Sequence, residues 1–576
     1  MTAALPPDRA DFAVRRRWAT LPFVENGHLG GQRVVVIGLD GLEVTHAERL
    51  MAAGELPALA ALGRRSARFL LDHGPAQRTG LAWEHVASGQ TPDAARRWAA
   101  VEFDPSTYRV WQDGARFEPW WERIDRRTVV FDTPYVDLRR APRTRGIVAW
   151  GAHDPGTFLT GRPAGVLDEF VERFGRYPAA PWTYGIPWPS AERAQTMGEA
   201  LSGALAVRTQ AARWLMSERL PDWDLFIAVA GELHGSVEGL WHGVDPRHPL
   251  HAHPSAPAAA EALLAVHRGL DRMVDELTRA AGDAAVVAFT MGGMGTNHSD
   301  VQSMALLPEL LYRHAFGRSL LTVPDAWAAV PGAVPILNAH ERWEPVRLIP
   351  RPAAAADGTG MLHALARSLP RPMRAALKGV RAGVGKWRSG GAPTPRLDLT
   401  WQPATHYRDH WPRMRAFALP SFYDGRIRIN LRGRERDGLV DPARYEETCR
   451  EIETLLRECR DPRTGEPAVE DIERAATRDP LALHGSECDL IVVWRSPAAA
   501  LEHPRLGIVG PVALRRTGGH TGRYGMAYLA APGLPPGDHG VRSAFDVVPT
   551  VLDLLGCPPP AHVSGASLLA AAPTSR

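Results

Sequence analysis

Cysteine is scarce in this chain of 576 residues, which contains only Cys449, Cys459, Cys488 and Cys557. None of them belongs to a CxxC pair, so their spacing favours neither a cysteine zinc site nor a disulfide framework. The first 448 residues hold no cysteine at all. A sulfatase that uses a cysteine in a Cys-x-Pro-x-Arg setting is therefore disfavoured.

Long apolar runs and an excess of one charge are also missing. No run reaches the roughly 18 apolar residues of a membrane helix, and the polar first thirty residues lack the apolar centre of a signal peptide. The formal net charge of +3 is too small for a dedicated nucleic-acid-binding protein. There is no HExxH, and the glycines at 292, 293 and 295 depart from GxGxxG. We expect a cytoplasmic protein with no membrane partner and no stable nucleic acid complex.

Residues 34–41, VVVIGLDG, are the most informative stretch that is present. A continuous apolar run that ends in an acid and a glycine is typical of a buried parallel strand, and Gly41 lets the backbone turn sharply. Ligands of open α/β sheets bind outside the carboxyl ends of the strands, so Asp40 stands where a metal ligand is expected. The alternative is that Asp40 only caps a helix that starts near Thr45.

Strand and helix patterns then alternate along the chain. Strands are predicted at 225–229, 285–289, 490–494 and 526–529, with helices at 47–68, 193–219, 258–281 and 445–460; two further short strands, 128–131 and 146–150, are expected in a segment added to this core. This alternation predicts an α/β fold with a mostly parallel central sheet flanked by helices. We expect an N-terminal arm over 1–30 and one domain over 31–576, with inserted cap segments at about 90–190 and 301–480. The basic tract 351–396 is either an anion-facing cap, a partner surface or a solvated loop.

Three further sites carry residues suited to chemistry. Thr79, in RTGLAW, stands where a helix is expected to start, and its hydroxyl is either part of an oxyanion site or an ordinary N-cap. His234 and Glu238 are four residues apart and share one helix face, as a zinc or manganese pair or as a surface pair. His520 lies between glycines, which either present its imidazole closely or form a flexible polar loop.

Several separated segments resemble the type I phosphodiesterase/nucleotide pyrophosphatase group of the alkaline phosphatase superfamily, in that family's order. They are VVVIGLDGLEVTHAERLMAAGELPALAAL, TGLAW, GELHGSVEGLWHGVDPRHP, FTMGGMGTN, INLRGRERDGLV, RTGGHTGRYGMAYLAAPGL and DVVPTVLDLLGCPPP. The resemblance implies an alkaline-phosphatase-like fold. It also implies two metal ions, usually zinc, that flank a Ser/Thr nucleophile attacking phosphorus.

Carried over residue by residue, the resemblance makes Thr79 the nucleophile and Asp40 a ligand of the metal beside it. It makes His520 a ligand of the other metal. It also assigns His234 and Glu238 to that second metal, at positions where the family has Asp and His.

The resemblance fails where the family has an Asp-His pair, because this chain has Met291 and Gly292 there. Neither residue supplies an oxygen or imidazole ligand, so the metal beside Thr79 is expected to be weakly held or missing. One ion, Zn²⁺ or Mn²⁺, would then be held by His234, Glu238 and His520.

Two functions follow as hypotheses. The first is a metal-dependent hydrolase of phosphoester or phosphodiester bonds, with Thr79 as nucleophile, a reduced metal site and a small phosphorylated or nucleotide-like substrate. The second is a catalytically impaired pseudoenzyme of the same fold that binds a phosphorylated ligand or a partner protein. The missing Asp-His pair favours the second hypothesis, whereas the retained Asp40, Thr79 and His520 favour the first.

Overall fold

The structure is a computed structural model that describes residues 31–152, 154, 157–183, 190–328, 334–336, 396–475 and 479–570. The predicted N-terminal arm, 1–30, lies outside these residues, as does the basic tract 351–396 except for its last residue. No helix within the described ranges is long and apolar enough to cross a membrane.

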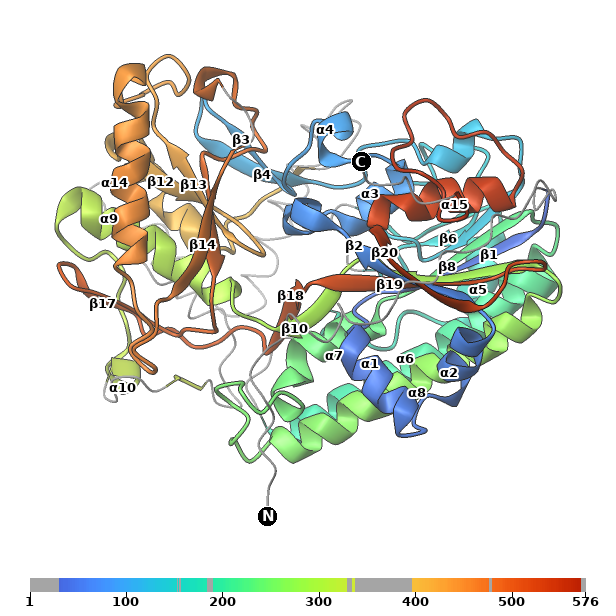
Figure 1. Cartoon of the computed structure of the whole chain (residues 1–576). Coiled ribbons are helices and arrows are strands. Elements are labelled where there is room, and N and C mark those ends of the chain that lie inside the picture. Colours follow the sequence, from blue (N-terminus) through green and yellow to red (C-terminus); the bar gives the residue numbers. More distant parts are fainter. Residues whose placement is uncertain are drawn as a thin grey trace, which may run out of the picture.

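A twisted central sheet organises the larger part of the described chain (Figure 1). Its strands, in the order in which they lie side by side, are β20 (Gly537–Ser543), β2 (Ala67–Asp72), β19 (Tyr524–Ala530), β9 (Ala285–Thr290), β1 (Val34–Leu39), β8 (Leu225–Ala230), β5 (Thr128–Phe131), β6 (Arg145–Val148) and β7 (Thr160–Arg162). β1 pairs in parallel with both β8 and β9, and β5 pairs in parallel with β8 and β6. The antiparallel members are β19, between β2 and β9, and β7 at the edge. The predicted mostly parallel central sheet is confirmed.

Helices cover both faces of this sheet (Figure 1). One face carries α1 (Val44–Ala52), α2 (Pro57–Arg64), α5 (Val166–Phe174), α6 (Ala191–Arg213), α7 (Glu232–Leu240) and α8 (Ala256–Ala280). The other face carries α3 (Ala82–Ser88) and α15 (Val547–Leu554).

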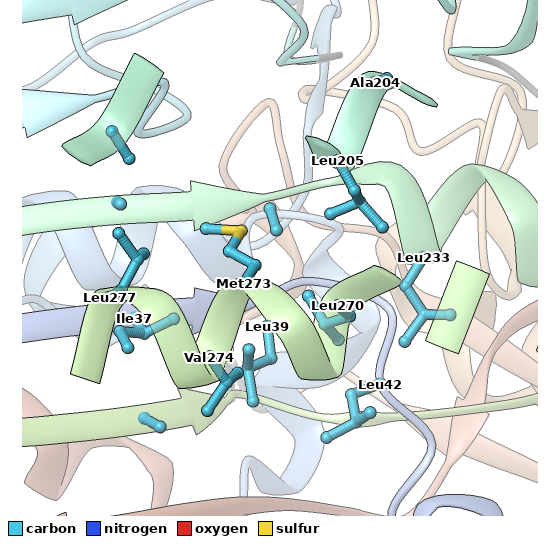
Figure 2. Close-up of a cluster of buried hydrophobic side chains, with 14 of the residues drawn as sticks. Ile37, Leu39, Leu42, Ala204, Leu205, Leu233, Leu270, Met273, Val274 and Leu277 are labelled. Carbon is cyan, nitrogen blue, oxygen red and sulfur yellow. The ribbon is translucent and has the colours of Figure 1, made fainter. Parts of the chain in front are cut away.

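The alternation of side chains along β1 explains why both faces need a cover. Val35, Ile37 and Leu39 enter the hydrophobic cluster under α6, α7 and α8, whereas Val34 and Val36 enter the cluster under α3 and α15. Successive strand residues point to opposite faces, so a strand buried on both sides must be apolar throughout. Figure 2 shows the first cluster, in which Ile37 and Leu39 lie against side chains of α8 such as Leu270, Val274 and Leu277.

A smaller lobe is built around a second, antiparallel sheet with the order β12-β13-β15-β14 (Figure 1). Its strands and covering helices are β12 (Ala416–Leu419), β13 (Gly425–Ile429), β14 (Val469–Arg474), β15 (Leu490–Trp494), α9 (Leu307–Phe316) and α14 (Tyr445–Arg457).

Short α-helices and strands lie outside these two sheets and their covering helices. They are α4 (Pro92–Ala95), α10 (Asp325–Ala328), β3 (Val101–Asp104), β4 (Arg109–Asp113), β10 (Gly293–Thr296), β11 (Arg396–Leu397), β16 (Leu501–His503), β17 (Gly507–Val509) and β18 (Gly518–Gly522). β10 and β18 pair with each other and lie between the sheet and the lobe (Figure 1).

Three expectations drawn from the sequence need correction. The single helix predicted over 47–68 is wrong: α1 ends near Gly54, which has a φ of +79°, α2 starts at Pro57, and β2 begins at Ala67. The predicted strand 490–494 is β15, but it belongs to the smaller antiparallel sheet. Part of the segment 90–190, expected to be an addition, supplies β5, β6 and β7 to the central sheet.

Candidate functional site

Asp40 follows the last residue of β1 and is buried, with 4% of its surface exposed. Its backbone N–H donates to the carbonyl of Ala230, at the end of the neighbouring strand β8. The acid that caps α1 is Glu43, whose carboxylate accepts from the backbone N–H groups of Thr45 and His46. The alternative role of Asp40 as a helix cap is therefore wrong, and the carboxylate lies at the carboxyl edge of the sheet.

Gly41 brings this edge into contact with α7. Its φ is +85°, and a Cβ atom at this position would lie 2.3 Å from the backbone nitrogen of His234. Only glycine leaves room for so close an approach of two backbones. The turn thus places Asp40 beside the first turn of α7.

His234 and Glu238 lie on one face of α7, as their spacing predicts. His234 Nδ1 lies 3.2 Å from Asp40 Oδ2, and His234 Nε2 lies 3.1 Å from Glu238 Oε1. Both side chains are buried. The imidazole therefore links two carboxylates that are almost two hundred positions apart in the chain.

The two carboxylates set the charge of His234. Burial by itself would lower the pKa of this imidazole, but the negative charges of Asp40 and Glu238 outweigh burial and raise the pKa to about 10. Burial by itself would raise the pKa of the Glu238 carboxyl. The positive charges of the nearby Arg516 and His234 outweigh burial and lower this pKa to about 2. At neutral pH the imidazole is positively charged and donates from both ring nitrogens, and Glu238 is ionised.

His520 lies in β18, the strand that packs against α7. A Cβ atom at Gly518 would lie 2.3 Å from the carbonyl oxygen of Val237, so the glycines beside His520 do permit a close approach. The ring centroids of His520 and His234 are 4.7 Å apart, edge to face, and those of His520 and Tyr423 are 5.1 Å apart, also edge to face. The structure thus gathers Asp40, His234, Glu238 and His520 into one place.

Two arginines that the sequence reasoning missed also belong to this place. Arg516 Nη1 donates to Glu238 Oε1 in a close ion pair, and Arg515 Nη1 lies 2.7 Å from Asp300 Oδ2. Arg516 Nε is 3.8 Å from the same oxygen of Asp300, so the two pairs form one network. The signal was present in the sequence, because both arginines lie within five positions before the glycine-flanked His520.

Thr79 ends a 3₁₀ segment, Gly74–Thr79, and is followed by Gly80 with a φ of +72°. Its hydroxyl donates to the carbonyl of Ala76 at 2.8 Å and accepts from the backbone N–H of Leu81 at 3.2 Å. Thr79 is therefore not the first residue of a helix, since α3 starts three positions later at Ala82. The hydroxyl stabilises the turn between the two helical segments.

Gln77 connects this turn to the rest of the site. Its side-chain amide donates to the carbonyls of His520 and Gly522, at 3.2 and 2.7 Å. It also lies beside Gly292, where a Cβ atom would approach the amide carbon to 3.5 Å. Met291 is buried in the hydrophobic cluster under α3 and α15. An amide and a thioether thus line the position where the resemblance places an Asp-His pair.

The side chains do not fit a metal ion in the arrangement that the structure shows. Within the described ranges, no group of three or more His, Cys, Asp or Glu side chains is placed to hold one. Both ring nitrogens of His234 face carboxylates, and Glu238 Oε1 faces a guanidinium. The predicted ligand set of Asp40, His234, Glu238 and His520 is close together, yet its charges are paired within the protein.

The stretch that follows α7 is rich in histidine, with His242, His248, His251 and His253, and it packs at the start of α8. His242 and His253 lie 3.0 and 2.9 Å from Ser255 Oγ, and His251 Nδ1 lies 2.8 Å from the carbonyl of His242. Burial lowers the pKa of His242 to about 4. These contacts make the histidine-rich stretch a packed turn of the fold.

Comparison with known proteins gives structural similarity without sequence matches. No family model matches the sequence, and no curated protein matches it significantly. The chain is similar to a phosphonoacetate hydrolase from Sinorhizobium meliloti 1021 solved with phosphonoformate (14% identity, TM-score 0.44, covering 92% of this chain and 98% of that one). It is also similar to human ectonucleotide pyrophosphatase/phosphodiesterase 5 (8%, 0.43, 93% and 97%) and to the wild-type alkaline phosphatase PafA (10%, 0.48, 94% and 98%).

Proposed function

We propose that this protein is a catalytically impaired member of the alkaline phosphatase superfamily that binds, and does not hydrolyse, a small phosphorylated ligand. The observation that carries the proposal is the contact chain Asp40–His234–Glu238, in which the donors expected to hold a metal are occupied by one another. The ligand class rests on the sequence resemblance to phosphodiesterases and nucleotide pyrophosphatases.

The surroundings of Thr79 support the loss of catalysis. A threonine hydroxyl becomes a nucleophile only when a base or a metal helps to remove its proton. The Thr79 proton is instead donated to the carbonyl of Ala76, which is a poor base. The position that would hold the neighbouring metal is lined by Met291, Gly292 and the amide of Gln77, which provide no charged ligand.

A metal-dependent hydrolase with one Zn²⁺ or Mn²⁺ ion is the second candidate, and one observation favours it. Glu238 Oε2 is buried and has no hydrogen-bond partner among the described residues. A buried oxygen of this kind is costly unless a ligand satisfies it. Together with His234 and His520, this oxygen would offer a His₂Glu set, provided that Glu238 left Arg516.

Hydrolysis assays and binding measurements separate the two candidates. Purified protein would be given p-nitrophenyl phosphate and bis(p-nitrophenyl) phosphate, with and without added Zn²⁺ or Mn²⁺, beside the variant Thr79→Ala. We expect no hydrolysis above that of the variant, and saturable binding of AMP or inorganic phosphate by calorimetry. Metal-dependent hydrolysis that disappears in Thr79→Ala would establish the hydrolase instead.

A further inference from the structure

Arg516 is a largely buried arginine that pairs with Glu238. Only 11% of its side chain is exposed, and its guanidinium is in close contact with the Glu238 carboxylate, itself 1% exposed. The two residues are 278 positions apart, so the pair ties the segment before β18 to α7. The backbone supports the same contact, because the N–H of Thr517 donates to the carbonyl of Glu238 at 2.7 Å.

The wider network balances its charges. Three carboxylates, those of Asp40, Glu238 and Asp300, face three cations, His234, Arg515 and Arg516. Their contacts lie between 2.7 and 3.8 Å, and the Arg516–Glu238 pair is closer still. A group of buried carboxylates is normally stabilised by cations, which are either metal ions or protein side chains. Here the chain supplies the cations itself.

We propose that Arg516 takes the place of a metal ion at Glu238, and that its guanidinium keeps divalent metals out of the group formed by Asp40, His234, Glu238 and His520. The inference rests on the proposed function, which it deepens by naming the residue that excludes the metal.

The chemistry of arginine makes this exclusion durable. A guanidinium remains protonated at every pH at which the protein is folded, so base does not release Glu238 by neutralising Arg516. A divalent ion at the same carboxylate would also meet the positive charge of Arg516 in a poorly solvated place, where repulsion is strong.

The neighbouring arginine provides a matched control. Arg515 is buried, adjacent in sequence and ion-paired with Asp300. Its charge also helps to lower the pKa of Glu238, but the close ion pair with Glu238 belongs to Arg516. Removal of Arg515 takes away one positive charge from the same network and leaves the Arg516–Glu238 contact. A general loss of charge and a specific release of Glu238 can therefore be distinguished.

The test is zinc binding by the purified full-length chain, measured after equilibrium dialysis by elemental analysis and, with Co²⁺ in place of Zn²⁺, by visible absorption. We expect wild type, Arg515→Ala and Arg516→Lys to bind no stoichiometric zinc. Arg516→Ala, or the longer uncharged Arg516→Met if the alanine variant is unstable, should bind about one ion per chain at least about tenfold more tightly than wild type. Adding Glu238→Gln to the Arg516 variant should abolish that gain.

Two results would overturn the inference, and both differ from failure of the proposed function. In the first, the wild type binds stoichiometric zinc and Glu238→Gln does not. This result can be obtained even if no Arg516 variant folds. The other is a folded Arg516→Ala or Arg516→Met protein that binds no more zinc than Arg515→Ala. Hydrolysis by the wild type is a separate measurement: it would refute the proposed function even if zinc were excluded from Glu238.

Discussion

The hydroxyl of Thr79 shows how much a single residue can reveal about the site. It makes two hydrogen bonds to the backbone around it, to the carbonyl of Ala76 and from the N–H of Leu81. Both partners belong to the turn that Gly80 closes with a positive φ. Thr79, which the resemblance makes the nucleophile, therefore has a structural role in this turn whether or not it takes part in catalysis.

We predict that Thr79→Val lowers the free energy of unfolding by about 1 to 2 kcal/mol, because valine keeps the shape but leaves a buried carbonyl and N–H without their partner. Urea unfolding followed by circular dichroism measures the change. Thr79→Ser keeps the hydroxyl and should stay much closer to wild type. Equal stability of the valine variant and wild type would show that the hydroxyl contributes nothing to the turn.

At the scale of elements, the site depends on the contact between the end of β1 and the start of α7. Gly41 lies in this contact, and a Cβ atom there would lie 2.3 Å from the nitrogen and 2.4 Å from the Cα of His234. Those atoms are backbone and cannot rotate away. The alignment of Asp40 with His234 is therefore fixed by the packing of two elements.

Gly41→Ala is expected to lower the free energy of unfolding by roughly 2 to 4 kcal/mol, through the strained φ and the forced separation of β1 and α7. Gly54→Ala is the matched control: Gly54 has a similar φ of +79° but nothing within 4 Å of a Cβ atom. Gly54→Ala should lower the free energy of unfolding by about 1 kcal/mol, from backbone strain alone. Similar losses for both variants in urea unfolding would contradict the close approach.

The elements also show what the sequence could and could not predict. The apolar run before Asp40 and the four-residue spacing of His234 and Glu238 are local patterns, and the structure has the strand and the helix where those patterns indicate. β2 was missed because its buried residues alternate with half-buried ones in a short stretch that directly follows a helix. The Arg516–Glu238 pair joins positions 278 apart, and no local periodicity reports such a contact.

Across the whole molecule, buried histidines outside the site are held neutral. Burial lowers the pKa of His267 and His73 to about 4 and that of His46 to about 3. His267 and His46 face each other with ring centroids 5.1 Å apart, in the contact between α8 and α1. In the unfolded chain these groups titrate near the ordinary value of 6.5. The unfolded state therefore binds more protons than the folded state below that pH.

Stability should thus fall as the pH drops from about 6.5 towards 4, since protons that bind only to the unfolded chain favour unfolding. His267→Gln removes one of these groups and should reduce the loss by up to about 3 kcal/mol at pH 4, because one pKa unit corresponds to about 1.4 kcal/mol. Urea unfolding of both proteins between pH 4 and 7.5 measures the slopes. Parallel curves would show that His267 does not contribute to acid instability.

The most direct test of the impaired metal site is a crystal structure of the wild-type protein equilibrated with excess ZnCl₂, with anomalous data collected at the zinc edge. We predict no anomalous peak between His234, Glu238 and His520, and an Arg516 guanidinium that still contacts the Glu238 carboxylate. A strong peak bonded to these side chains, with Arg516 displaced from the carboxylate, would contradict this prediction.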